Sequence, residues 1–310
     1  MKNLFSKQGP LRPKFGKIPY ARWEWFTMRT LFALLCIYPS APIFLGLQTQ
    51  VAPNGIAQFV DLTFLSTPTA HEVLSWAFPI LLGLYVIGIF PFAVTAGLFA
   101  IHVAICTLIN SQGHINHTGQ VVGYVLLGQL LFHCYRWIRC ITGKESAKES
   151  AAHLHRDLIY GTQQGLVAAY VIAGLSKLIK SGWDWVASIP NMVLQLEKNY
   201  GMDYHDTLQE ATVEGTEFAT QLINNYPTVA KIILGGGLLL ELFAFLALWN
   251  RTFMALFGIA LISMHEVISS AMHLGFHFNK AALAIFFINV PFWAFALGRH
   301  LGSRNRLQPA

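Results

Sequence analysis

Long hydrophobic runs alternate along this chain with short polar segments. A helix needs roughly 20 apolar residues to cross the hydrocarbon core of a bilayer. The longest stretch without Asp, Glu, Lys or Arg runs from Val73 to Tyr135, which is enough chain for about three such helices. The pattern predicts an all-α protein, a polytopic bundle of about eight transmembrane helices. The expected spans are Thr27–Leu47, Leu74–Phe90, Phe92–Ile109, Gly119–Ile138, Tyr160–Ile179, Thr228–Trp249, Thr252–Leu274 and Ala281–Leu297.

Lys and Arg residues in the connecting segments indicate how the bundle is oriented. Basic residues cluster before the first expected span, between the fourth and fifth spans, and after the eighth. Such residues favour the cytoplasmic side, so both termini are expected there. The prediction divides the chain into a basic cytoplasmic tail (1–26), a transmembrane domain (27–299) with an acidic outer loop (180–226), and a second cytoplasmic tail (300–310). Pro91 marks a tight hairpin between the second and third spans.

Composition supports a membrane protein and argues against binding to nucleic acid. Apolar residues make up 54% of the chain and charged residues 12%, with a formal net charge of +6. The basic residues that give this charge flank the apolar runs instead of forming a separate basic surface, so they are assigned to topology and not to nucleic acid. The 4 cysteines include no C-x-x-C pair and lie outside long polar loops, so a disulfide framework is not expected.

Ionisable residues inside the expected spans are costly and need an explanation. Lys177 lies near the outer end of the fifth span. It either snorkels to the headgroups or, held in an apolar site, loses its proton and acts as a base. Glu241 lies near the middle of the sixth span, where it is expected to be protonated or paired. It follows Gly235, Gly236 and Gly237, whose missing side chains allow a backbone or a flat ligand to approach closely.

Histidines supply further candidates. His265 and Ser269 share one face of the seventh span, which is either a hydrogen-bonded packing seam or the lining of a site. By the rise per residue, His265 and Glu241 differ in depth by only ~6 Å and can pair, whereas Lys177 lies ~10 Å above the midplane. A direct salt bridge from Lys177 to Glu241 is therefore not expected unless a helix tilts. Asn116 and His117, at the outer start of the fourth span, are either an interfacial cap or part of the same outward-facing cavity. Trp183 and Trp185 are first interpreted as an interfacial aromatic belt.

Four segments together resemble the vitamin K-dependent gamma-carboxylase family and its bacterial relatives, the HTTM domain proteins. The resemblance covers about Thr27 to Trp293, in matching order and spacing. The segments are Asn116–Thr118, the lysine motif Tyr170–Leu178 with the Trp after it, the glycine-rich motif Gly235–Leu242, and His265 to Gly275.

The resemblance implies that Lys177 is a catalytic base. In the carboxylases a lysine at this position deprotonates vitamin K hydroquinone, which reacts with oxygen to give a strong base. That base removes a proton from a glutamate side chain, and carbon dioxide then adds. The resemblance also implies that His117 assists carboxylation. We add His265 as a third catalytic candidate, with Asn116, Gly235, Gly236, Gly237, Glu241 and Ser269 as candidates for binding the quinone.

The chain departs from the carboxylases in ways that leave the substrate open. The carboxylases carry a large lumenal region after the bundle, which is not expected here, and the outer loop of this chain is acidic, which would repel a glutamate-rich peptide. The substrate therefore stays open, with a peptide or a small acid as candidates; the expected location is a bacterial inner membrane. The alternative is a non-enzymatic quinone- or lipid-binding subunit for export or maturation of a partner. A metal or haem protein and a transporter are further alternatives, although no metal ligands are predicted, since the H-x-x-H-like pairs His114/His117 and His273/His277 lie on different spans.

Overall fold

The computed structural model describes residues 14, 18–47, 54–112, 119–144, 146–208, 214–272 and 274–305. Within these ranges the chain consists of helices and connecting turns, without a strand, which confirms the all-α class. The chain divides into two compact units. Over the described residues, we call 14–166 with 284–305 the first unit, and 167–283 the second unit.

Six helical segments among the described residues are long and apolar enough to cross a bilayer. They are Arg22–Leu45, Pro68–Ile87, Pro91–Asn110, Gln120–Ile141, Ala151–Ser181 and Arg251–Met272. A bent pair, His277–Ile288 with Val290–Gly298, makes a seventh if its halves form one span broken by 45°. The chain is therefore a multi-pass membrane protein whose helices contact lipid.

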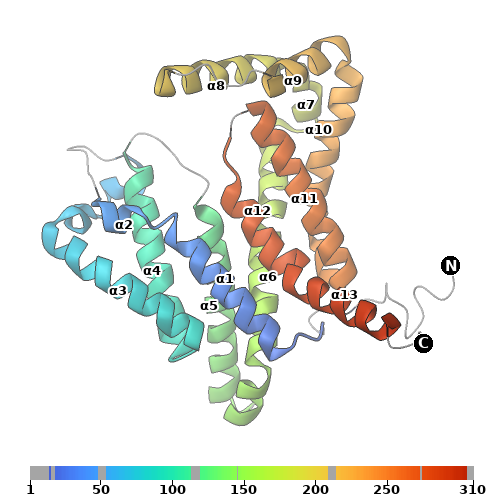
Figure 1. Cartoon of the computed structure of the whole chain (residues 1–310). Helices are drawn as coiled ribbons and strands as arrows, with labels where there is room; N and C mark the ends of the chain where they lie inside the picture. The colour runs from blue at the N-terminus through green and yellow to red at the C-terminus, as the bar shows by residue number, and fades with distance from the viewer. Residues whose placement is uncertain are drawn as a thin grey trace. The chain divides into compact units, whose positions relative to one another are not determined.

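The first unit contains the helices that precede residue 167 and the last helical segments of the chain (Figure 1). Its elements are α1 (Arg22–Ile37), α2 (Pro42–Leu45), η1 (Gly55–Gln58), η2 (Thr63–Ser66), α3 (Pro68–Ile87), α4 (Pro91–Asn110), α5 (Gln120–Ile141), the first part of α6 (Ala147–Ser181), a π-helical turn η5 (Ala284–Ile288) and α13 (Val290–Asn305). The predicted hairpin at Pro91 is confirmed, because Gly88, Ile89 and Phe90 alone separate α3 from α4. Gly88 adopts φ +85°, which favours glycine at this turn.

Close backbone contact between α5 and α6 depends on glycines in the first unit. A Cβ built on Gly128 would lie 2.3 Å from the Gly161 carbonyl oxygen, and one built on Gly165 would lie 2.5 Å from the Tyr124 carbonyl oxygen. Real Cβ atoms do not approach oxygen so closely, so only glycine permits this separation. Small residues at helix contacts are the usual means of close packing inside a bilayer.

The second unit contains the C-terminal part of α6 and the helices up to residue 283 (Figure 1). Its further elements are α7 (Asp184–Ala187), η3 (Ile189–Asn191), α8 (Met192–Thr207), α9 (Glu214–Asn225), α10 (Pro227–Leu242), η4 (Ala244–Trp249), α11 (Arg251–Met272) and α12 (His277–Leu283). The predicted outer loop 180–226 is thus largely helical. Ile189, Leu196 and Ile223 from this segment are buried together with Ala230 of α10.

Hydrogen bonds connect the segment 180–226 to the end of α11. The Asn199 Nδ2 donates to the Met272 carbonyl at 3.1 Å, and the Thr216 hydroxyl donates to the Ala271 carbonyl at 3.1 Å. Carbonyls in the last turn of a helix have no hydrogen-bond partner within the helix. The Asn199 and Thr216 side chains supply that partner for two of them.

Two of the expected spans differ from straight helices of full length. The sixth is made of α10, which has 16 residues, and the 3-10 segment η4 that follows it. The eighth is broken at Asn289, which has φ 54°. Pro291 explains the break, because it has no N–H to donate to the preceding turn and its ring clashes with that turn.

Candidate functional site

An ion pair between Lys177 and Glu241 joins α6 to α10 in the second unit. Lys177 Nζ lies 2.5 Å from Glu241 Oε2. The Glu241 side chain is 8% exposed and the Lys177 side chain 33%. The ammonium also lies over the Trp185 ring, 5.3 Å from its centroid, in cation–π geometry. The Lys177 ammonium therefore has two partners, the buried Glu241 carboxylate and the Trp185 ring.

The prediction that Lys177 and Glu241 form no direct salt bridge is wrong. Gly174, about one turn before Lys177, is the residue that lies beside Glu241: a Cβ built on Gly174 would lie 3.3 Å from Glu241 Cβ and 3.0 Å from Leu242 Cδ2. Side chains on a helix lean toward its N-terminus, so the long Lys177 side chain covers the turn at Gly174 and reaches Glu241. The depth calculation compared backbone positions in upright helices and left out this lean and the length of the side chain.

A second polar contact joins α6 to α11. The Tyr170 hydroxyl lies 2.8 Å from His265 Nε2, and the buried His265 ring stacks on Phe276 with centroids 4.5 Å apart. The expected pairing of His265 with Glu241 does not occur, because each residue has a different partner. His265 nevertheless lies within electrostatic range of Lys177, and Tyr170 within range of Glu241. The two contacts thus belong to one polar group, which we call the Lys177 cluster: Tyr170, Lys177, Glu241, His265, Ser269 and Asn279.

Three buried polar atoms of this cluster have no hydrogen-bond partner in the described part of the chain: His265 Nδ1, Ser269 Oγ and Asn279 Oδ1. Ser269 follows His265 by four residues and shares its face of α11, as predicted. Asn279 lies close enough to the Tyr170 hydroxyl to interact with it. A buried polar atom left unsatisfied costs about 1–3 kcal/mol, so these atoms favour a ligand that brings hydrogen-bonding groups.

Sequence reasoning missed two residues of the site. Tyr170 precedes Lys177 by seven residues and therefore shares its helix face; this spacing could have identified it. Trp185 was assigned to the aromatic belt, but it packs over the Lys177 ammonium. Its position depends on Gly182, which has φ +57° and ends α6, so that the chain turns back toward the helix.

The glycine triplet is packed less closely than expected. A Cβ on Gly235 would lie 3.7 Å from Val186, one on Gly237 would lie 3.5 Å from the Met264 sulfur, and one on Gly236 would meet nothing within 4 Å. These are ordinary contacts with side chains, so the expected close approach of another backbone is wrong. Gly174 of α6 is packed more tightly, because a Cβ there would lie 3.0 Å from Leu242 Cδ2 and 3.3 Å from Glu241 Cβ of α10. Whether a flat ligand lies beside the triplet stays a prediction.

Another ion pair in the second unit provides a useful comparison. Lys280 Nζ contacts Glu266 Oε2, joining α12 to α11. The Glu266 side chain is 67% exposed and the Lys280 side chain 19%, so the carboxylate of this pair is solvated, whereas the Glu241 carboxylate is buried.

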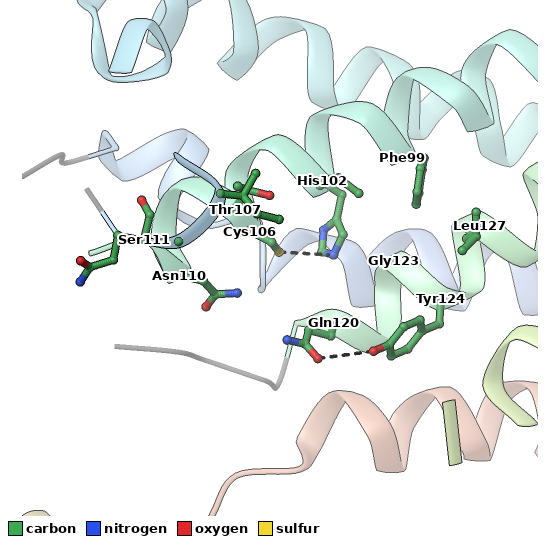
Figure 2. Close-up of a pocket in the computed structure, with 14 residues that line it drawn as sticks. Phe99, His102, Cys106, Thr107, Asn110, Ser111, Gln120, Gly123, Tyr124 and Leu127 are labelled. Atoms are coloured by element: carbon green, nitrogen blue, oxygen red, sulfur yellow. Dashed lines mark hydrogen bonds between the residues drawn. The ribbon is translucent and has the colours of Figure 1, made fainter. Parts of the chain in front are cut away.

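Asn116 and His117 lie outside the described residues, as do His114 and His273. The roles proposed for Asn116 and His117 stay predictions. The neighbouring part of the first unit, where α4 ends and α5 begins, contains a pocket of about 470 Å³ (Figure 2). His102 lies in its wall, with Nε2 3.0 Å from the Gly119 carbonyl oxygen and 3.5 Å from Cys106 Sγ. Because a carbonyl only accepts, His102 Nε2 carries a hydrogen.

No three His, Cys, Asp or Glu side chains of the described residues come together as metal ligands would. Comparison of the chain with models of protein families, with curated proteins and with solved structures finds no match.

Proposed function

We propose that the chain binds a quinone or quinol at the Lys177 cluster and exchanges a proton with it, as a membrane enzyme resembling the vitamin K-dependent gamma-carboxylases. The observation that carries the proposal is the set of unpartnered buried atoms, His265 Nδ1, Ser269 Oγ and Asn279 Oδ1, in the same cluster as the Lys177–Glu241 ion pair. A site of this kind within membrane helices is accessible to a ligand that dissolves in lipid.

The residues present fit such a ligand. A quinol carries two oxygens on a flat apolar ring, and each oxygen can donate and accept hydrogen bonds. His265 Nδ1 and the Ser269 hydroxyl can donate, and Asn279 Oδ1 can accept. If Tyr170 donates to His265 Nε2, the neutral imidazole carries its hydrogen on Nδ1 and can donate to a ligand oxygen.

Proton transfer depends on the Lys177–Glu241 pair. When bound, a hydroquinone supplies an ionisable hydroxyl and, with oxygen, the strong base that the resemblance implies. Lys177 can accept a proton only as a neutral amine, and Glu241 Oε2 lies 2.5 Å from Nζ, close enough to take its proton. The result is a neutral amine beside a neutral acid. Addition of carbon dioxide to a peptide or small acid is the reaction that the resemblance implies.

A second candidate function is a non-enzymatic quinone- or lipid-binding subunit that supports export or maturation of a partner. The observation that favours it is the double contact of Lys177 with Glu241 and Trp185. Both contacts stabilise the protonated amine, which is what a lysine with a purely structural role requires.

Lys177→Arg separates the two functions. Arginine keeps the positive charge for Glu241 and Trp185 but does not lose its proton at accessible pH. A photoreactive prenylated quinone should label peptides of α6 and α11 in both the wild type and the variant. Quinol consumption under oxygen should fall by about 10²-fold or more in Lys177→Arg and stay unchanged in Lys180→Arg, the same change on an exposed neighbour. Full turnover in Lys177→Arg would favour the non-enzymatic function, and labelling confined to other helices would refute the binding site.

For topology we propose eight spans with both termini in the cytoplasm of a bacterial inner membrane. The bent pair in residues 277–298 supplies one of the two spans beyond the six long helices. The other is α10 with η4: 16 residues at the α-helical rise give ~24 Å, and 6 residues at the 3-10 rise add ~12 Å. Together they exceed the ~30 Å of a hydrocarbon core.

A further inference from the structure

A pocket of about 400 Å³ opens in the first unit beside Arg29 of α1. Its walls come from α1, the α3–α4 turn, α5 and the early part of α6. The lining residues that bear on its chemistry are Arg22, Arg29, Gly88, Gln129, His133 and His155.

The topology of the first unit places this pocket toward one face of the membrane. α1 begins at Arg22, α3 ends just before Gly88, α5 ends at Ile141 and α6 begins at Ala147. Successive spans run in opposite directions, so these ends lie at the same face, and the traces of α1, α3, α4 and α5 agree with this (Figure 1).

The pocket is electropositive. Arginines and histidines line it, and no Asp or Glu is found among its described lining residues. The two nearest acidic residues along the lining helices are already engaged. Glu24 accepts from the Ala21 backbone N–H and from Asn289 Nδ2, and Asp157 pairs with Arg136 and Arg156.

Two nitrogen atoms in the wall are buried and have no partner within the described residues: Arg29 Nε and His133 Nε2. His133 is 7% exposed. The Arg29 guanidinium is held in place on two sides. Its carbon lies 5.8 Å from the centroid of the Trp25 ring, and its Nη1 occupies the space a Cβ on Gly88 would fill, at 2.5 Å. The positive charge is therefore positioned before any ligand arrives.

We propose that this pocket binds the phosphate of an anionic phospholipid headgroup. A guanidinium offers several N–H groups in a planar fork that matches phosphate oxygens, and such charge-assisted bonds are stronger than neutral ones. Arg29 Nε gains the acceptor it lacks, His133 Nε2 donates to the phosphate in the tautomer that carries its hydrogen there, and Arg22 adds charge at the rim. Basic pockets between transmembrane helices are suited to lipid headgroups of this kind.

Exposed apolar side chains beside the pocket identify a lipid, and not free phosphate, as the source of the phosphate group. Ile87, Phe90 and Phe92 flank the lining residues of the α3–α4 turn and are 68%, 75% and 48% exposed. A lipid whose phosphate occupies the pocket can lay its acyl chains along these residues. Inorganic phosphate gains nothing from them.

The test is lipid binding to the full-length protein in detergent, measured by native mass spectrometry during titration with phosphatidylglycerol. Wild-type protein should bind phosphatidylglycerol in preference to phosphatidylcholine, and Arg29→Gln should weaken that binding by about tenfold or more, the loss of one charge-assisted contact. Arg139→Gln removes the same charge from a residue of α5 that does not line the pocket, so it should bind as the wild type does. Arg29→Lys keeps the charge without the fork and should fall in between, which also covers the case that Arg29→Gln does not fold.

Two results would overturn the proposal. One is an equal affinity of wild type and both Arg29 variants for phosphatidylglycerol. The other is displacement of the lipid by inorganic phosphate. If phosphate at matched concentration displaces the lipid completely, the pocket is a site for free anions and the acyl chains contribute nothing to binding.

Discussion

Removing either partner of the Lys177–Glu241 pair should have unequal effects on stability. Lys177→Met leaves the Glu241 carboxylate, 8% exposed, without its partner, whereas Glu241→Leu leaves an amine that is 33% exposed and still lies over Trp185. Breaking a fully buried pair costs about 3–5 kcal/mol. Because Lys177 is one third exposed and Glu241 can take up a proton, we expect about 2–3 kcal/mol for Lys177→Met and about 1 kcal/mol for Glu241→Leu.

The double variant Lys177→Met/Glu241→Leu should be less destabilised than the sum of the single variants. Replacing both members of a buried pair by apolar residues removes the cost of burying either charge alone. The coupling free energy should be about 1–2 kcal/mol. Unfolding of the purified protein by SDS, followed by circular dichroism, gives the free energies for the cycle.

The pair Lys280–Glu266 is the comparison, and its cycle should give a coupling below about 1 kcal/mol because its carboxylate is exposed to solvent. Additive effects of Lys177→Met and Glu241→Leu would show that the ion pair does not couple α6 to α10. A stable Lys177→Met would show that Lys177 acts as a lone charge, since removing a lone charge from a membrane helix costs nothing.

Two further predictions concern packing and topology. Gly128→Ala should destabilise the protein by about 1–3 kcal/mol, because its Cβ would lie 2.3 Å from the Gly161 carbonyl oxygen and α5 would have to move away from α6. The control is Gly236→Ala, whose Cβ would meet nothing within 4 Å. Equal SDS unfolding curves for the two variants would contradict the close packing of α5 on α6. Reporter fusions at Gly201 and Leu307 should lie on opposite sides of the membrane, outside and inside respectively, and activity of both reporters on one side would refute the eight-span topology.

The sequence predicts the helices well because the bilayer imposes one strong requirement. Every backbone polar group in the hydrocarbon core must be satisfied within its own helix, so a long apolar run identifies a span with little help from the rest of the chain. The ends of the hairpin at Pro91 follow from proline chemistry in the same way. The broken span at Asn289 follows from Pro291, and this signal was present in the sequence but was not used.

The contacts of the Lys177 cluster could be predicted only in part. Spacing within one helix places Ser269 on the face of His265, and the same rule would have placed Tyr170 on the face of Lys177. Contacts between helices depend instead on how closely the helices approach and on where their side chains point. Gly174 sets how closely α6 and α10 approach, and the lean of the Lys177 side chain decides which residue it meets. Neither can be read from hydrophobic periodicity, which fixes faces but not separations.

The ion pair changes what a base at Lys177 requires. A lone lysine in an apolar site loses its proton because burial disfavours the charge, and no other residue is needed. A lysine 2.5 Å from a buried carboxylate keeps its proton unless that carboxylate takes it, so the amine becomes a base only together with Glu241. Any basicity of Lys177 is therefore a property of the pair. Glu241→Gln would leave the Lys177 amine without a carboxylate that can receive its proton. A base mechanism through this pair therefore needs both residues.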